Sequence, residues 1–132
     1  MAWIHLVALL ALAQYLLFGA LVGKARGQYG VQAPATTGNA VFERYYRVQM
    51  NTLELMVVLL PAMWIAAAYW DPRWVAAAGA VYLLGRIVYL RAYTHNPASR
   101  GLGFMLSMAP VAVLTAAALV GAALRLLNGA AS

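Results

Sequence analysis

Residues 1–23 read MAWIHLVALLALAQYLLFGALVG, an apolar stretch without a single charged side chain. The hydrocarbon core of a bilayer is about 30 Å thick, and about 20 residues of α-helix cross it. A cleavable signal peptide is the competing interpretation of such a stretch. It would begin with a basic segment and use only about 7–15 apolar residues. We therefore predict that residues 1–23 form a membrane-spanning helix that the protein retains.

Three further apolar runs follow, separated by segments rich in turn-forming residues. Gly, Pro, Thr and Asn are frequent in residues 24–40, residues 71–73 form an Asp-Pro-Arg turn, and residues 95–103 hold another Pro and two Gly. Short connections make consecutive helices antiparallel neighbours. We predict one all-α domain over residues 1–132, an integral membrane four-helix bundle with up-down-up-down topology. The predicted spans are residues 1–23, 41–70, 74–95 and 104–127.

The composition excludes several other classes of protein. Hydrophobic residues make up 65% of the chain and charged residues only 9%, too few to cover a surface that faces water. Such high hydrophobicity also excludes a disordered chain. The net charge of +6 comes without a run of Lys or Arg, so we predict no nucleic-acid partner. With no cysteine and two histidines, the chain offers no set of ligands for a metal, and we predict none.

Basic residues are concentrated in two of the three connections and the helix ends beside them. Cytoplasmic loops of membrane proteins carry an excess of Lys and Arg. We therefore predict that the first and third connections are cytoplasmic, and the very short loops favour a bacterial cytoplasmic membrane. The first connection region holds Lys24, Arg26, Arg44 and Arg47, the third holds Arg91 and Arg100, and the second holds only Arg73 beside Asp71.

The second predicted helix carries a polar stripe. At about 100° per residue, Arg44, Arg47, Asn51 and Glu54 share a face about 80° wide, with Glu43 beside it. Charged groups are costly in lipid, so this face must contact protein or a water-filled cleft.

The third predicted helix carries a matching stripe within about 60°, and Arg100 follows in the next connection. Its members are Tyr82, Arg86, Tyr89 and Tyr93. Arginines bind carboxylates through paired hydrogen bonds, a glutamate suits an amino group, and an amide suits a peptide backbone. Together the stripes suit a small zwitterionic peptide with more than one carboxylate. Alternatively, buried Arg–Glu pairs hold the helices together and the tyrosines form an interfacial belt.

At these residues the sequence resembles the MAPEG family (membrane-associated proteins in eicosanoid and glutathione metabolism). The resemblance implies a homotrimer of four-helix bundles, with glutathione bound between subunits near the cytoplasmic face. The matching signatures are Phe42-Glu43-Arg44-x-x-Arg47-x-Gln49-x-Asn51-x-x-Glu54, Tyr82-x-x-x-Arg86-x-x-Tyr89-x-x-x-Tyr93 with Arg100, and the approach Thr36-Thr37-Gly38.

The resemblance also implies roles for individual residues. Arg47, Asn51, Glu54, Tyr89 and Tyr93 match residues that bind glutathione from one subunit, and Arg86 is added to this candidate set. Arg26 and Gln49 match residues that the neighbouring subunit contributes. Arg100 matches the arginine that faces the glutathione sulfur and is the candidate catalytic residue. Two positions depart from the pattern of some synthases in the family. Leu55 stands in place of a tyrosine, so the resemblance does not supply that contact to glutathione. Gly27 stands in place of an arginine that assists the substrate, which argues against a leukotriene-specific role and an eicosanoid substrate.

Arg100 is chemically suited to that role on general grounds. A cysteine thiol has a pKa near 8.5, so little of it is the nucleophilic thiolate at neutral pH, and an adjacent guanidinium stabilises the thiolate. We predict a microsomal-type glutathione transferase that conjugates glutathione to a lipophilic electrophile from the bilayer, or reduces lipid hydroperoxides with it. The alternatives are a non-catalytic lipid-binding or scaffold protein of the same fold and a small proton-coupled exporter. An exporter would have an acidic residue within residues 1–23, which contain none.

Overall fold

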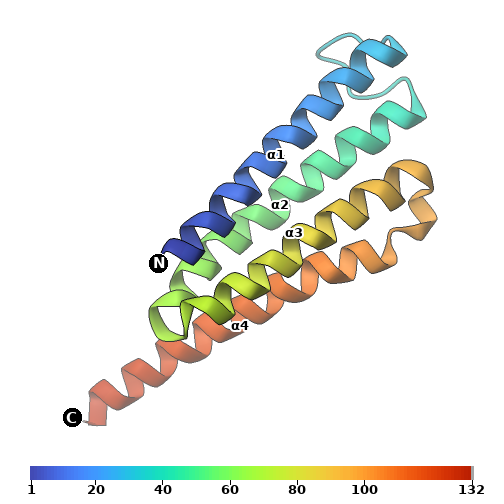
Figure 1. Ribbon diagram of the computed structural model, residues 1–132. Coiled ribbons are helices and arrows are strands. Elements are labelled where there is room, and N and C mark those ends of the chain that lie inside the picture. Colours follow the sequence, from blue (N-terminus) through green and yellow to red (C-terminus); the bar gives the residue numbers. More distant parts are fainter. Residues whose placement is uncertain (132) are drawn as a thin grey trace.

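Helices account for almost all of the structure. The computed structural model describes residues 1–131, and no strand occurs among them. Each helix except the short 3-10 helix η1 is long and apolar enough to cross a membrane, which confirms the prediction of an all-α protein with four spans. The elements are α1 (Ala2–Tyr29), α2 (Ala40–Tyr69), α3 (Pro72–His95), η1 (Pro97–Ser99) and α4 (Gly101–Ala131) (Figure 1).

The bounds of the first and last helices differ by several residues from the sequence-based prediction. The first helix continues to Tyr29 instead of ending near Gly23, because a glycine inside a helix costs only about 1 kcal/mol and the residues around Gly27 favour helix. It ends at Gly30, whose φ of 68° lies in the left-handed region and whose amide donates to the carbonyl of Arg26. The last helix begins at Gly101 rather than near residue 104 and continues to Ala131 rather than to residue 127.

Side chains at the helix starts explain where α2 and α3 begin. The Asn39 side chain accepts a hydrogen bond from the amide of Phe42 at 3.0 Å, and Asp71 accepts one from the amide of Arg73 at 2.9 Å. Both are residue types preferred at this position, since they satisfy amides that have no partner inside the helix. Hydrogen bonds from the side chain and the amide of Arg73 also lower the pKa of Asp71.

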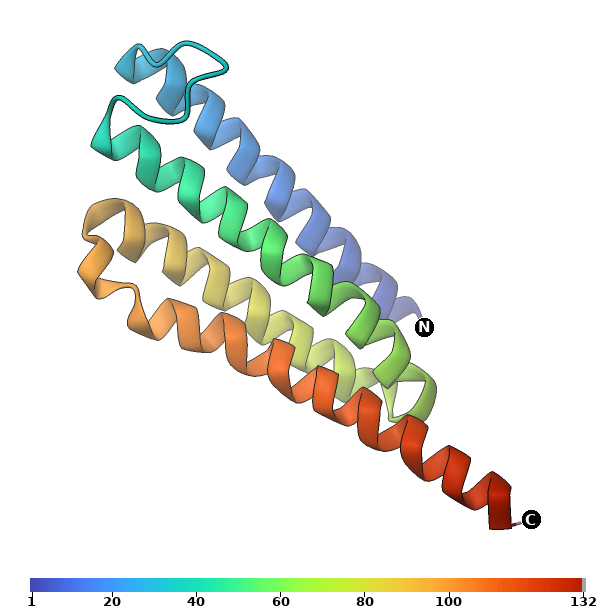
Figure 2. The same cartoon turned by 180° about the vertical axis from the view of Figure 1, so that it is seen from behind.

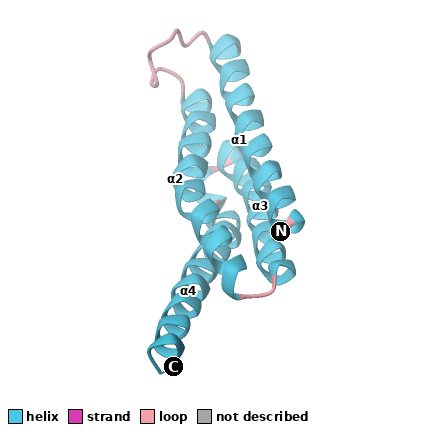
Figure 3. Cartoon of the chain, turned by 90° about the vertical axis from the view of Figure 1, so that its left-hand side faces the viewer, coloured by secondary structure: helices cyan, strands magenta, loops and turns pink. Residues whose placement is uncertain are grey.

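The chain reverses direction at each connection, and the four long helices lie side by side (Figures 1 and 2). α1 and α4 both pack against α2 and α3, so α2 and α3 form the centre of the bundle. Residues 30–39 and the α3–α4 connection lie at one end of the bundle, and α4 projects past the other helices at the opposite end (Figure 3).

The interior is packed with small and medium apolar side chains, and the outside is also apolar. α1 buries Ile4, Val7, Ala8 and Ala11 at helical spacing against the core of α2. Large apolar residues remain exposed along every long helix; Trp74, for example, is 77% exposed. A water-soluble monomer exposes no such continuous apolar surface, so this exterior fits lipid or other subunits.

Glycines bring α3 and α4 into backbone contact near the end where the connections cluster. A Cβ atom added to Gly85 would lie 2.6 Å from the carbonyl carbon of Leu106, and one added to Gly103 would overlap the backbone of Tyr89. Small residues at such crossings let membrane helices approach closely. The contact places the tyrosines of α3 directly beside the first turns of α4.

Candidate functional site

A polar pocket lies where α2, α3 and the start of α4 meet. Its volume is about 210 Å³, and every side chain but one in its lining is polar or charged. The structure thus brings together residues from both polar stripes of the sequence and the arginine that follows them. The lining residues are Arg47 and Asn51 from α2, Tyr89 and Tyr93 from α3, Arg100 at the C-terminal end of η1, and Phe104 from α4.

The charge of the pocket is positive. Arg47 and Arg100 are both exposed, and neither forms an ion pair within residues 1–131, where the only ion pair joins Arg73 and Asp71. No carboxylate lines the pocket. Its cations are therefore available to an anionic ligand.

Two stacked tyrosines form one wall. The ring centroids of Tyr89 and Tyr93 are 5.4 Å apart and their planes differ by 16°. Tyr89 is buried and Tyr93 is half-buried. The pocket combines their phenol groups with the amide of Asn51 and two guanidinium groups, which suits carboxylates and peptide groups.

Arg86 lies behind this wall and does not line the pocket. Its side chain is fully buried, and its guanidinium carbon lies 4.3 Å from the ring centroid of Tyr89. Nε donates to the hydroxyl of Ser107 at 2.8 Å, and Nη1 donates to Oδ1 of Asn51 at 2.8 Å and to Oγ1 of Thr52 at 3.2 Å. Arg86 therefore joins α2, α3 and α4, and its predicted direct contact with glutathione stays a prediction.

Glu54 and Arg44, the other charged members of the α2 stripe, also lie off the pocket. Glu54 is exposed and has no ion-pair partner in the described part of the chain. Arg44 donates to the carbonyls of Thr94 and His95 at 3.3 and 3.4 Å, at the end of α3. Arg44 thus stabilises a helix end, where cations interact favourably with the exposed carbonyls.

Arg26 on α1 and Gln49 on α2 both lie where these two helices face each other. Arg26 donates to the carbonyl of Ala35 at 2.7 Å and stacks on the ring of Phe42, so it holds residues 30–39 in place. Gln49 packs beneath Gly19, where its Nε2 lies 2.8 Å from the position of an added Cβ. Neither residue lines the polar pocket.

The sequence pattern did not indicate three residues that lie near the site. Thr52 and Ser107 are buried acceptors for Arg86, and Phe104 is the apolar member of the pocket lining. A small hydroxyl residue inside an apolar run is the sequence feature that could have indicated Thr52 and Ser107. Phe104 gave no signal, because one aromatic residue in an apolar run is typical of any membrane helix.

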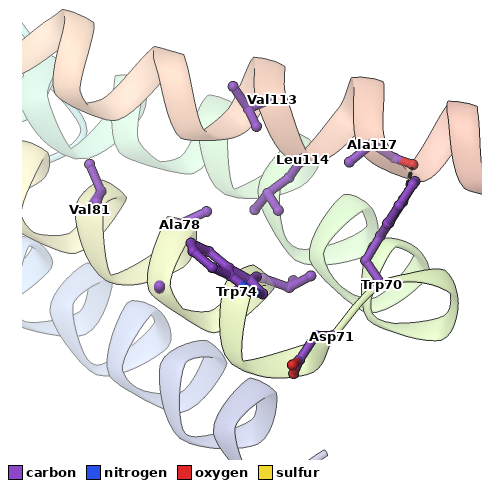
Figure 4. A pocket seen from close by; sticks show the side chains of 10 residues that line it. Trp70, Asp71, Trp74, Ala78, Val81, Val113, Leu114 and Ala117 are labelled. Carbon is purple, nitrogen blue, oxygen red and sulfur yellow. Dashed lines mark hydrogen bonds between the residues drawn. The ribbon is translucent and has the colours of Figure 1, made fainter.

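A larger groove lies toward the other end of α3, between α3 and α4 (Figure 4). It has a volume of about 570 Å³ and is lined mainly by apolar residues, including Trp70 and Trp74. Trp70 Nε1 donates to the carbonyl of Ala117 at 2.8 Å, which fixes one side of the groove. Asp71 is its one charged residue, so the groove lacks the polar chemistry of the first pocket.

Comparisons with known proteins place the chain in a family. The profile of the MAPEG family matches residues 4–120. An uncharacterised protein of Synechocystis sp. is 46% identical over 118 residues, covering 89% of this chain and 86% of the relative. Human microsomal glutathione S-transferase 2 is 36% identical over 117 residues (89% and 80%), and guinea-pig leukotriene C4 synthase is 33% identical over 134 residues (92% and 89%). With its four membrane-spanning helices, this chain is an integral membrane protein that belongs to the MAPEG family.

Proposed function

We propose that the protein is a membrane-bound glutathione transferase that converts glutathione to its thiolate and conjugates it to lipophilic electrophiles. The observation that carries this proposal is the positive pocket lined by Arg47, Asn51, Tyr89, Tyr93 and Arg100. The relatives named as a glutathione transferase and a leukotriene C4 synthase support it. Reduction of lipid hydroperoxides by the same thiolate is included in the proposal.

Each lining group has a chemical task in this proposal. Glutathione carries two carboxylates, which Arg47 and the Asn51 amide bind, while the phenols of Tyr89 and Tyr93 bind other polar groups of the peptide. The guanidinium of Arg100 stabilises the thiolate, and each pKa unit of depression corresponds to about 1.4 kcal/mol. In conjugation the sulfur forms a bond to the electrophilic carbon, a leaving group such as chloride departs, and the thiol proton passes to water.

The proposed assembly is a homotrimer that crosses the membrane up-down-up-down, with glutathione bound between subunits. An exposed carboxylate within a membrane span, Glu54, supports this assembly, because lipid would be a costly environment for it. Arg26 and Gln49 lie away from their own protomer's pocket, so they can serve only a neighbouring subunit's site unless the helices move. The mainly apolar exterior is available both to the neighbour and to lipid.

Activity of the purified protein tests the function directly. Protein in detergent or vesicles, supplied with glutathione and 1-chloro-2,4-dinitrobenzene, should form the conjugate faster than glutathione does in buffer. The rate is followed by absorbance, with heat-denatured protein as the control. If glutathione binds but no rate above the buffer reaction is seen with this electrophile or with a lipid hydroperoxide, the protein is a non-catalytic binding or scaffold member of the fold.

Substitution of Glu54 tests the predicted binding stripe. Glu54→Gln should raise the Kd for glutathione by about tenfold or more, because a hydrogen bond to a charged group contributes about 1.5–3 kcal/mol. Isothermal titration calorimetry measures the Kd, and Glu43→Gln on the same helix serves as the matched control. An unchanged Kd in Glu54→Gln would assign this carboxylate a purely structural role.

Labelling from the two sides of the membrane tests the orientation. The chain has no cysteine, so single-cysteine variants report one position each. We expect Ala98→Cys to react with an impermeant maleimide from the cytoplasmic side and Arg73→Cys from the opposite side. Arg73 is exposed, and loss of its ion pair to Asp71 has little effect on stability. Reaction of both positions from the same side would refute the proposed topology.

A further inference from the structure

Arg86 is a fully buried cation that is held by neutral groups alone. No carboxylate among residues 1–131 pairs with it, and its hydrogen-bond acceptors are the Asn51 amide and the hydroxyls of Ser107 and Thr52. A buried charge is costly unless it is well hydrogen-bonded. Packing alone does not account for a buried arginine in this setting. The hydrogen bond from Arg86 to Asn51 indicates a second role, which is to orient the Asn51 amide.

The contact fixes which way the Asn51 amide points. A guanidinium donates hydrogen bonds and accepts none. The atom of Asn51 that lies 2.8 Å from Nη1 of Arg86 must therefore be the carbonyl oxygen, Oδ1. The Nδ2 group, with two N–H donors, is then directed away from Arg86. It donates to no residue in the described range 1–131, while the Asn51 side chain lines the pocket.

Arg86 is itself held at several points, so its position does not depend on Asn51. The Ser107 hydroxyl donates to the carbonyl of Gly103 at 2.7 Å and so presents a lone pair to Nε of Arg86. The Thr52 hydroxyl donates to the carbonyl of Val48 at 2.7 Å and likewise accepts from Nη1. The ring of Tyr89 covers the guanidinium. Two helix backbones and an aromatic ring therefore set the position of the guanidinium.

We propose that Arg86 is a positioning residue that, together with Ser107, locks the Asn51 amide with its N–H groups toward the pocket. This point of the site then takes a hydrogen-bond acceptor of the ligand, a carboxylate or peptide carbonyl oxygen, and discriminates against a donor. The inference rests on the proposed function for the ligand's identity. It adds that the selectivity of Asn51 is imposed by a side chain outside the pocket.

Replacement of the Asn51 amide by a carboxylate tests the proposed orientation of this side chain. An aspartate side chain is nearly the same size as that of asparagine and would form an ion pair with Arg86, so the fold should be kept. It would also replace the two N–H donors with an acceptor. Stability and binding are therefore expected to change in opposite directions, which a purely structural role for the contact between Asn51 and Arg86 would not produce.

The experiment compares Asn51→Asp with the unsubstituted protein in thermal unfolding and in glutathione binding. We expect an unfolding midpoint equal to or above that of the unsubstituted protein and a Kd for glutathione raised about tenfold or more. Thiolate absorbance at saturating glutathione should remain, because Arg100 is untouched. A Kd within about twofold of the unsubstituted value would overturn the inference.

A milder pair of variants covers the case in which Asn51→Asp fails to fold. Ser107→Ala removes the acceptor for Nε of Arg86, and Thr115→Val removes a hydroxyl that donates to its own helix backbone at 2.8 Å on α4, away from Arg86. We expect the first to weaken glutathione binding several-fold and the second to leave it unchanged. Equal affinity in both would overturn the positioning role. If the unsubstituted protein binds no glutathione, the proposed function fails, and the inference fails with it.

Discussion

Arg100→Ala should remove the thiolate absorbance of bound glutathione while changing the Kd for glutathione by less than about tenfold. Arg100 is exposed and lines the pocket beside Tyr93 and Phe104, so its loss should leave the other binding groups in place. Without the guanidinium the bound thiol should titrate near its ordinary pKa of about 8.5, and little thiolate would remain at pH 7. Loss of such electrostatic stabilisation typically lowers kcat by about 10²–10³.

The measurement is the ultraviolet difference absorbance of glutathione bound to purified protein, together with kcat at saturating glutathione. Arg91→Ala is the matched control, because Arg91 is also exposed near the end of α3 but does not line the pocket. A thiolate signal that survives in Arg100→Ala would move the activating role to Arg47, the other cation of the lining. Partial recovery of the signal in Arg100→Lys would show that positive charge at this position is what matters.

Gly103→Val should cause a large loss of stability. The Cβ of any residue at position 103 would overlap the backbone of Tyr89, which cannot move aside as a side-chain tip can. Overpacking of a well-packed interior costs about 1–3 kcal/mol, and here two helix backbones must separate. We expect a lower unfolding midpoint and weaker glutathione binding, because Tyr89 and Phe104 both line the pocket.

Gly101→Ala is a close control for that prediction. Gly101 lies in the same turn of α4, and an added Cβ would meet no atom within 4 Å. Alanine favours helix over glycine by about 1 kcal/mol, so this variant should be as stable as the unsubstituted protein or more so. Thermal unfolding followed by circular dichroism compares the two. Equal midpoints for Gly103→Val and Gly101→Ala would show that α3 and α4 do not pack as described.

The sequence was sufficient to predict the four helices and the gathering of polar groups. Apolar runs of bilayer length fix the helices, and helical periodicity places Arg47 and Asn51 on one face of α2. The same periodicity could not show how deeply each side chain is buried. Arg86 and Tyr89 share a stripe, but only Tyr89 lines the pocket. Arg86 is fully buried inside the bundle, where α4 packs against it and Ser107 accepts its hydrogen bond.

Two glycines also differ in the structure from what their local sequence signal predicts. Glycine is typical of loops, so the sequence predicts Gly101 and Gly103 in a connection, but both are helical in α4. At Gly103 the missing side chain is what allows contact with α3.

Glu54 shows a different limit of the sequence pattern, because it follows the stripe of Arg47 and Asn51 but is exposed outside the pocket. The sequence pattern of one chain does not show what covers an exposed side chain.

The lengths of the long helices bear on how the protein sits among lipids of different kinds. The uncharged parts of α1 and α4, residues 2–23 and 101–124, correspond to about 33 and 36 Å at 1.5 Å per residue, somewhat more than the roughly 30 Å hydrocarbon thickness. Such hydrophobic mismatch is relieved by tilting or by local stretching of acyl chains. We therefore expect lipids with longer acyl chains to accommodate this bundle with less tilt, and the depth of the polar pocket in the membrane to depend on acyl-chain length.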